Sequence, residues 1–358
     1  MASLKLPHVL LPYVVLLIAM ICNVPVHAHA RAEHIIRGSN YINFPTTHRG
    51  KYLEGGGYLV MPPTFTQGQP PVPVIVILHG SRGIMDEREP VYAHELASMG
   101  VAAFIVDSFS PRGITDTTEN QRQLTNRDFV NDAFAALKML SADPRIDAVR
   151  SGIIGYSKSG QVAMQTALRY IRSQSNISKQ HRFKAHYLFY PACNFHFYEQ
   201  KTTGAPITFF LGERDEYTGV TQCVDLANEL KVHGADVTTI IYPDGYHGWD
   251  VPGFEFMPGA EVHLNCRFYE QADGTWEERF SGIKNIPDLT SAQYEKARRA
   301  CVSRGATVSG NNAIRFQGIE TLKQLVQKQV VEWKMPEQPS VNPPVMENNE
   351  SGNLVLEE

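Results

Sequence analysis

Short runs of apolar residues alternate with longer amphipathic segments through the middle of the chain. Continuous apolar runs that are rich in Val, Ile and Phe fall at residues 74–78, 101–106, 152–156, 186–190, 207–211 and 237–242. Runs that are apolar on both faces are typical of parallel strands covered by helices. The segments between them have helical spacing, as at Ala133, Leu137 and Leu140. This alternation predicts an α/β fold with a doubly wound, mostly parallel sheet and helices on both faces.

Other segments flank this alternating core. Residues 39–62 combine glycines with an alternating pattern, which predicts antiparallel edge strands. Residues 250–315 lack a clear period, and we expect an irregular, disulfide-containing elaboration of one α/β domain over residues 31–334. A final helix is expected at about residues 318–333. Residues 335–358 are rich in Pro, Asn and Glu, which is typical of a disordered tail.

The first thirty residues have the pattern of a secretory signal peptide. Lys5 gives a positive start, an apolar run covers residues 9–21, and residues 28–30 (Ala-His-Ala) resemble a cleavage site. The apolar run is shorter than the roughly 20 residues that span a bilayer. We therefore expect residues 1–30 to be removed and the protein to be exported, periplasmic or secreted, without stable membrane insertion. The alternative is an uncleaved anchor.

Composition limits the class of partner. The 358 residues have a formal net charge of −4 at pH 7 and no block of like charges. A nucleic-acid-binding protein usually carries a basic patch, so we expect no nucleic-acid partner. No spacing of Cys and His resembles a zinc site, and we expect neither a metal nor another cofactor. None of these patterns predicts the oligomeric state.

Four cysteines remain after the predicted cleavage, namely Cys193, Cys223, Cys266 and Cys301. An even number in an exported protein favours disulfides. Four cysteines allow three pairings. Four buried thiols are the alternative.

One serine lies where a predicted strand meets a predicted helix, in residues 155–160 (Gly-Tyr-Ser-Lys-Ser-Gly). A serine at such a junction occupies a sharp turn that exposes its hydroxyl, and small neighbours let strand and helix approach. The sequence is close to the pattern G-x-S-x-G, with Ser159 at the second glycine and Gly160 after it. Ser157 is therefore the candidate nucleophile.

A serine hydroxyl needs a base, which a carboxylate orients. Asp215 follows the predicted strand at 207–211, and His247 follows the one at 237–242. Both loops leave the carboxyl ends of parallel strands, the edge where Ser157 would lie. We therefore predict a catalytic triad of Ser157, Asp215 and His247, in the chain order that this type of turn requires. The rival residues in nearby loops are Glu213, Glu216, Asp250, His196 and His263.

Acyl transfer also needs N–H donors for the oxyanion. The backbone of Lys158 is one candidate, because it starts the helix that follows the nucleophile. Ser81 or Arg82, in the loop after the first core strand, is the other.

Several residues could contact substrate. Arg82 and Arg112 follow predicted strands and could bind a substrate carboxylate, although structural ion pairs are the alternative. The aromatic candidates for lining the pocket, which core packing would equally explain, are Phe109, Tyr156, Tyr217 and Trp249.

These motifs together resemble the dienelactone hydrolase family, and in particular exported relatives that have a serine nucleophile. The similarity covers roughly residues 50–333 and is carried by residues 79–83, 106–109, 112–113, 143–147, 155–157, 212–215 and 246–248. It implies an α/β-hydrolase fold and the same triad. The founding members have cysteine at the position of Ser157, so activity on dienelactone is not implied.

The resemblance also favours a disulfide between Cys193 and Cys223, which follow neighbouring strands. We then expect Cys266 to pair with Cys301.

The sequence therefore predicts a serine hydrolase that cleaves small-molecule carboxylic esters or lactones through an acyl-enzyme. A peptidase or amidase on the same fold is one alternative, although such enzymes commonly carry a propeller or a large cap domain. A non-catalytic binding protein is another, if Ser159 distorts the site.

Overall fold

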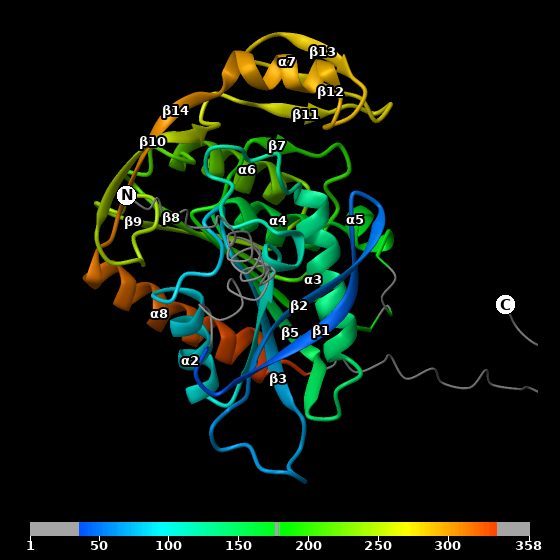
Figure 1. The fold of residues 1–358 in the computed structure, drawn as a ribbon, viewed down its shortest axis with the longest axis vertical. Coiled ribbons are helices and arrows are strands. Elements are labelled where there is room, and N and C mark those ends of the chain that lie inside the picture. The colour runs from blue at the N-terminus through cyan, green and yellow to red at the C-terminus, as the bar shows by residue number, and fades with distance from the viewer. Residues whose placement is uncertain (1–35, 176–177, 179, 335–358) are drawn as a thin grey trace, which may run out of the picture.

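A computed structural model describes residues 36–175, 178 and 180–334. The predicted signal peptide and the predicted tail lie outside these residues. An eight-stranded sheet crosses the molecule in the order β1-β2-β4-β3-β5-β6-β8-β9 (Figure 1). Its strands are β1 (Ser39–His48), β2 (Lys51–Val60), β3 (Val72–Leu78), β4 (Ala102–Asp107), β5 (Ile146–Tyr156), β6 (Ala185–Phe189), β8 (Ile207–Gly212) and β9 (Val237–Tyr242).

The strands from β4 to β9 pair in parallel, whereas β1 and β2 add an antiparallel edge. Central strands such as β3 and β4 are buried almost throughout, which explains their continuous apolar runs. The predicted α/β fold with a mostly parallel sheet is confirmed. Each run that the sequence marked as a core strand is a strand of this sheet.

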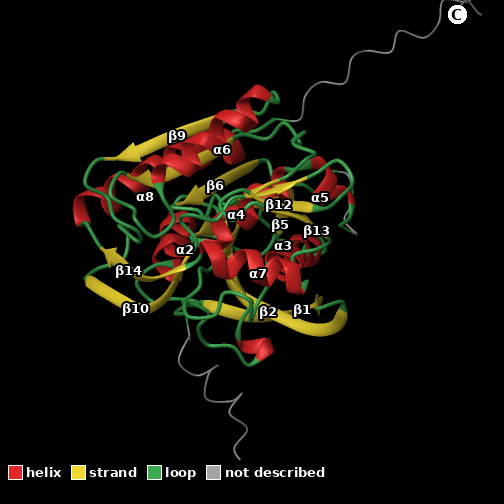
Figure 2. Cartoon of the chain, turned by 90° about the horizontal axis from the view of Figure 1, so that it is seen from above, coloured by secondary structure: helices red, strands yellow, loops and turns green. Residues whose placement is uncertain are grey.

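Helices cover both faces of the sheet (Figure 2). One face buries a cluster of apolar residues beneath three helices, and the other face buries a second cluster beneath two. The first three are α3 (Asn126–Leu140), α4 (Lys158–Ala167) and α6 (Val220–Val232), and the other two are α2 (Glu89–Ser98) and α8 (Asn312–Val326). A short α5 (Arg169–Ser173) follows α4.

Two helices differ from the sequence expectation. The last helix begins at Asn312 rather than at 318, because the Asn311 side chain accepts hydrogen bonds from the N–H groups of Ala313 and Ile314. Helix α2 has no counterpart in the sequence analysis. Its first residue, Glu89, is a buried carboxylate paired with Arg88, so its polar and apolar positions do not separate into two faces.

The segment between β9 and α8 forms a cap, which Figure 1 shows at the top of the view. We expected this segment to be irregular, but it contains a β-ribbon, a small sheet and a helix. Its strands are mostly three or four residues long, too short for a period to show in the sequence. The elements are β10 (Phe254–Val262), β11 (Phe268–Glu270), β12 (Trp276–Glu278), β13 (Ile283–Ile286), α7 (Ala292–Cys301) and β14 (Ser303–Ser309).

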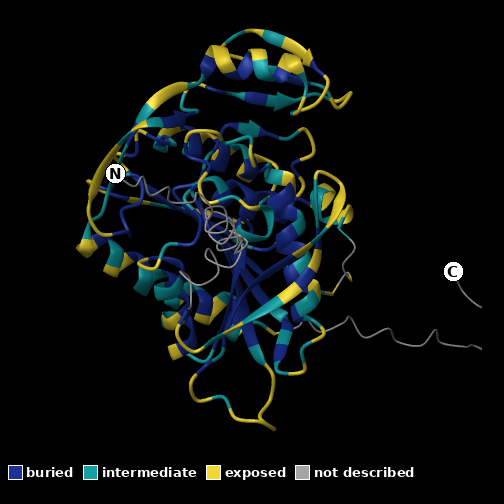
Figure 3. Ribbon diagram, in the orientation of Figure 1, coloured by how far each residue is buried: buried dark blue, intermediate teal, exposed yellow. Residues whose placement is uncertain are grey.

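The cap has its own small core. Cys266, Phe268, Trp276 and Ile286 are buried together with residues of α7. Figure 3 shows this buried seam between the cap sheet and α7, separate from the buried strands of the main sheet. The cap is therefore a packed unit rather than a loose loop.

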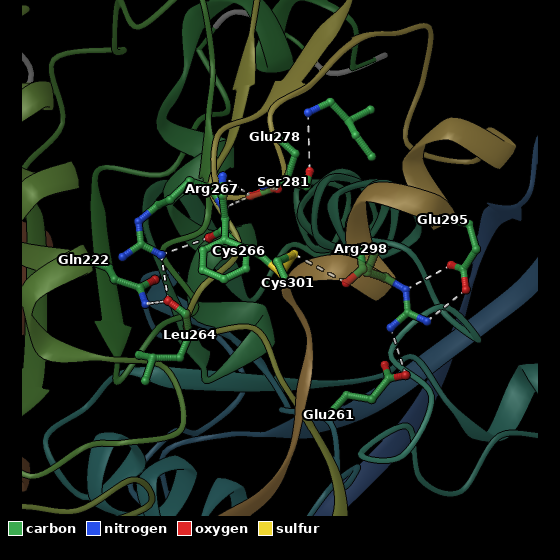
Figure 4. The surroundings of a disulfide bond; sticks show 12 residues. Gln222, Glu261, Leu264, Cys266, Arg267, Glu278, Ser281, Glu295, Arg298 and Cys301 are labelled. Carbon is green, nitrogen blue, oxygen red and sulfur yellow. Dashed lines mark hydrogen bonds and ion pairs between the residues drawn. A yellow bond between two sulfur atoms is a disulfide. The ribbon is translucent and has the colours of Figure 1, made fainter.

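One strand joins the cap to the main domain. β7 (Phe195–His196), which lies in the connection after β6, pairs in parallel with β11 of the cap. A disulfide links Cys193, just before β7, to Cys223 on α6. A second disulfide links Cys266 to Cys301 inside the cap, where Figure 4 shows Arg298 beside it. Backbone pairing thus joins the cap to the main domain, and one disulfide on each side of that pairing braces the segments that carry β7 and β11.

No helix among the described residues is long and apolar enough to cross a membrane.

Candidate active site

Ser157 occupies the turn between β5 and α4, with φ 55° and ψ −118°. A positive φ is costly for a residue other than glycine and persists only where the surroundings hold it. Here the Ser157 N–H donates to the Phe189 carbonyl at 2.9 Å, and the Ser157 carbonyl accepts from the Ala192 N–H at 3.1 Å. Gly155 must be glycine, because a Cβ there would lie 2.0 Å from the Ser159 carbonyl oxygen.

Ser159 completes this turn rather than distorting it. Its side chain is fully buried, and its Oγ accepts from the Tyr156 N–H at 2.9 Å and donates to the Leu78 carbonyl at 2.8 Å. The hydroxyl therefore ties the turn to the end of β3. A glycine at this position could make neither bond.

The structure brings the three predicted triad residues together. Ser157 Oγ lies 3.0 Å from His247 Nε2, and His247 Nδ1 lies 2.9 Å from Asp215 Oδ2. Asp215 and His247 are buried. Each residue follows the carboxyl end of a parallel strand, as the sequence pattern predicted.

Asp215 is oriented by its own loop. Oδ1 accepts from the N–H groups of Tyr217 and Thr218, both at 2.9 Å, and Oδ2 accepts from Thr218 Oγ1 at 2.7 Å. Burial opposes ionisation of Asp215, but His247 and the Thr218 hydrogen bonds outweigh it and place the pKa below its usual value. An ionised Asp215 accepts the His247 Nδ1 proton, which leaves Nε2 free to accept one from Ser157. No sequence pattern predicted the role of Thr218.

Two aromatic rings hold the His247 imidazole. The ring of Tyr190 lies 4.8 Å from it and the ring of Tyr217 lies 4.7 Å from it, centroid to centroid. The Tyr190 hydroxyl donates to Asp250 Oδ1 at 2.6 Å. Asp250, a rival acid in the sequence, is therefore bonded to Tyr190.

The other rival residues have different surroundings. Glu213 and Glu216 are exposed, and His196 pairs with Glu229 on α6 at 2.5 Å. His263 lies in the cap, where burial lowers its pKa to about 4.

The predicted oxyanion donors lie beside the nucleophile. The backbone N–H groups of Ser81, Arg82 and Lys158 have no acceptor among the described residues. The Ser81 carbonyl accepts from the Thr117 N–H at 2.8 Å, and its hydroxyl donates to Gln121 at 2.9 Å, so the Ser81 loop is fixed. The Arg82 side chain pairs with Glu255 of the cap at 2.6 Å.

The Lys158 side chain is bonded to the loop that precedes α3. Its ammonium donates to the backbone carbonyls of Gln121 and Leu124. Burial lowers the pKa of Lys158 to about 7. The Lys158 backbone can thus face the reacting centre while its side chain secures the loop beneath the cap.

Three residues expected to contact substrate lie elsewhere. Arg112 is buried and makes two 2.9 Å hydrogen bonds to Asp132 on α3, because that buried carboxylate needs a counter-ion. Tyr156 and Trp249 are fully buried, and Trp249 packs against Gly318 of α8. These three side chains therefore make structural contacts, and the expectation that they bind substrate is corrected. Phe109 is likewise buried, with its ring 4.4 Å from that of His79.

Two cavities of different size meet at Ser157. The smaller has a volume of about 40 Å³ and is lined by Ser157, His247, Arg82 and Met85 among others. The larger is a groove of about 1740 Å³ under the cap, lined by Ser157, Lys158 and Gln161. Tyr217 lines both cavities. No group of three His, Cys, Asp or Glu residues in the described part of the chain is placed to hold a metal ion.

The parallel sheet, the turn at Ser157 and the loops at its carboxyl edge define an α/β-hydrolase fold. The model of the dienelactone hydrolase family matches residues 57–270, which is more than half of the chain. The chain therefore belongs to the dienelactone hydrolase family and is an ester-hydrolysing enzyme. The resemblance inferred from the sequence is confirmed.

Similar solved structures are distant. Esterase Est2 of Thermogutta terrifontis has 13% identity and a TM-score of 0.49, covering 61% of this chain and 86% of its own. The α/β hydrolase MGS-M1 from a deep-sea metagenome library of the Medee basin has 19% identity and a TM-score of 0.44, covering 59% and 84%. Est1E from Butyrivibrio proteoclasticus has 15% identity and a TM-score of 0.42, covering 59% and 90%. The comparison with curated proteins finds no match.

Proposed function

We propose that the protein is a serine hydrolase that cleaves carboxylic esters or lactones of small molecules through an acyl-enzyme. One observation carries the proposal: hydrogen bonds of 3.0 Å and 2.9 Å run without a break from Ser157 through His247 to Asp215. A carboxylate and an imidazole in this arrangement activate a serine hydroxyl for attack.

In the acylation step, Ser157 Oγ attacks the ester carbonyl carbon while His247 Nε2 takes the hydroxyl proton. The carbonyl oxygen becomes an oxyanion, which the backbone N–H group of Lys158 and that of Ser81 or Arg82 would stabilise. When the carbonyl re-forms, the bond to the alcohol oxygen breaks and His247 donates its proton to that oxygen.

In the second step a water molecule attacks the acyl-enzyme. His247 takes a proton from the water, the bond to Ser157 Oγ breaks, and the proton returns to Oγ. The products are the acid and the alcohol. Asp215 stays ionised throughout, because its hydrogen bonds favour the charged form, and it stabilises the imidazolium that forms twice per cycle.

We also propose that the protein acts outside the cytoplasm. The two disulfides support this, because such bonds persist in oxidising compartments. The signal-peptide pattern in residues 1–30 agrees with the same destination.

A fluorophosphonate probe tests the nucleophile. We expect the wild type to be labelled and Ser157→Ala to remain unlabelled, because the probe reacts with an activated serine hydroxyl. Ser173→Ala, which removes an exposed hydroxyl on α5, is the matched control and should be labelled like the wild type. Labelling of Ser157→Ala at the wild-type rate would assign the nucleophile to another residue.

A further inference from the structure

Ser157 stands between two spaces of very different size. About 40 Å³ is available on the side that His247 lines, and about 1740 Å³ is available under the cap. Ligand pockets typically have volumes of about 300–1,000 Å³, so the first space admits only a very small group and the second admits a large one. An ester held at Ser157 must place its acyl part in one space and its alcohol part in the other.

The position of His247 decides which part goes where. The imidazole must reach the oxygen of the leaving alcohol to protonate it. His247 lines the small cavity and does not line the groove. The alcohol therefore departs on the small side, and the acyl group extends into the groove.

A buried polar atom near the start of the groove has no protein partner. Gln161, one helical turn after Ser157 on α4, is 2% exposed. Its Oε1 accepts from Asn126 at 3.2 Å, but its Nε2 has no partner among the described residues. An unsatisfied buried donor is destabilising, and an acceptor on the substrate would satisfy it. Gln161 lines the groove and is therefore placed to bind the acyl group.

Aromatic side chains form a wall of the groove further along. Phe195 and Phe197 pack edge-on against Trp276 of the cap, with ring centroids 5.9 Å and 5.4 Å apart, and all three line the groove. Phe195 lies three residues after Ala192, whose N–H bonds to the Ser157 carbonyl, so the chain from Ala192 to this wall spans at most about 11 Å. An aromatic ring carried by the acyl group would extend from Ser157 toward this wall.

Two of the cations that line the groove, Arg298 and Lys158, are already paired. Arg298 bonds to Glu261 at 2.9 Å, as Figure 4 shows, and the Lys158 ammonium bonds to two backbone carbonyls. Binding an anionic acyl group would break such pairs in a partly desolvated space. An uncharged acyl group leaves both of these pairs intact.

We propose that the enzyme prefers esters that join a bulky, uncharged aryl or arylalkyl acid to a small alcohol such as methanol. This proposal rests on the proposed serine-esterase function and names its substrate class. The acid carries the ring into the groove against Trp276, and a hydrogen-bond acceptor on the acid meets Gln161 Nε2. The small alcohol occupies the cavity beside His247.

Two isomeric esters test the orientation. Methyl hydrocinnamate carries its ring on the acid, and phenethyl acetate carries it on the alcohol, so their composition is identical. We expect kcat/KM to be at least about tenfold higher for methyl hydrocinnamate, within the range that a hydrophobic pocket can discriminate. Equal values, or a preference for phenethyl acetate, would overturn the substrate class while leaving the serine esterase in place. Absence of both fluorophosphonate labelling and hydrolysis of these esters and ethyl acetate would overturn the proposed function itself.

Variants test the two contacts. Trp276→Ala should reduce the ratio of kcat/KM for the two isomers about tenfold, and Trp276→Phe, which keeps the cap core filled, should reduce it less. Gln161→Met should abolish any preference for a ring-methoxy derivative of methyl hydrocinnamate over the parent ester. Phe280→Ala removes an exposed ring of the cap and is the control that keeps the wild-type ratio. An unchanged ratio in folded Trp276→Ala would refute the aromatic wall.

Discussion

Removing the Ser159 hydroxyl should destabilise the protein far more than removing an exposed hydroxyl. Ser159 accepts from the Tyr156 N–H at 2.9 Å and donates to the Leu78 carbonyl at 2.8 Å in a fully buried position. Each net bond contributes about 1 kcal/mol, and an orphaned buried donor costs about 1–3 kcal/mol. Ser159→Ala should therefore lower the free energy of unfolding by about 2–4 kcal/mol.

Urea unfolding followed by circular dichroism measures this loss as a lower midpoint with an unchanged slope. Ser173→Ala is the matched control, because its Oγ also donates to a backbone carbonyl, that of Tyr170 at 2.7 Å, but at an exposed site. We expect less than about 0.5 kcal/mol for Ser173→Ala. If both variants lose the same free energy, the argument that Ser159 holds the nucleophile turn is refuted.

Two further predictions concern the cap and the pH dependence of stability. Replacing Cys266 and Cys301 by alanine opens a loop with a sequence separation of 35, which should lower the free energy of unfolding by about 4 kcal/mol. Amide hydrogen exchange in α7 should become faster, while β3 stays protected. Exchange in α7 at the wild-type rate would contradict this prediction. Burial lowers the pKa of His186 from 6.5 to about 4, so below pH 6.5 only the unfolded state takes up this proton and stability falls toward pH 4. Between pH 7 and pH 4.5, the free energy of unfolding of His186→Leu should therefore fall by about 2–3 kcal/mol less than that of the wild type, as measured by urea unfolding. If the two proteins lose the same free energy over this range, His186 is not the group responsible.

The sequence predicted the fold and the positions of the triad because both depend on local pattern. Apolar runs mark the central strands, and Ser157, Asp215 and His247 each follow such a run directly. Their meeting at one edge then follows from the parallel direction of the strands. Predicting the positions of these three residues did not require knowledge of contacts between residues distant in the sequence.

The residues that the sequence misassigned depend on distant partners. Arg112 is held by Asp132 on α3, and Trp249 is held by Gly318 on α8, and neither partner is marked by a pattern. The role of Ser159 depends on Leu78, 81 residues earlier in the chain. Only the folded chain shows that the apparent departure from the glycine pattern is a structural bond.

The pairing of β7 with β11 has a consequence for how molecules enter and leave. An outward movement of the cap would pull on residues 192–195, because β7 pairs with β11 of the cap. The N–H of Ala192 donates to the Ser157 carbonyl, so this movement would also disturb the nucleophile turn. Each opening of the cap would therefore loosen the backbone that positions Ser157. We therefore expect the groove under the cap to stay open during turnover, so that diffusion rather than cap opening limits substrate entry and product release.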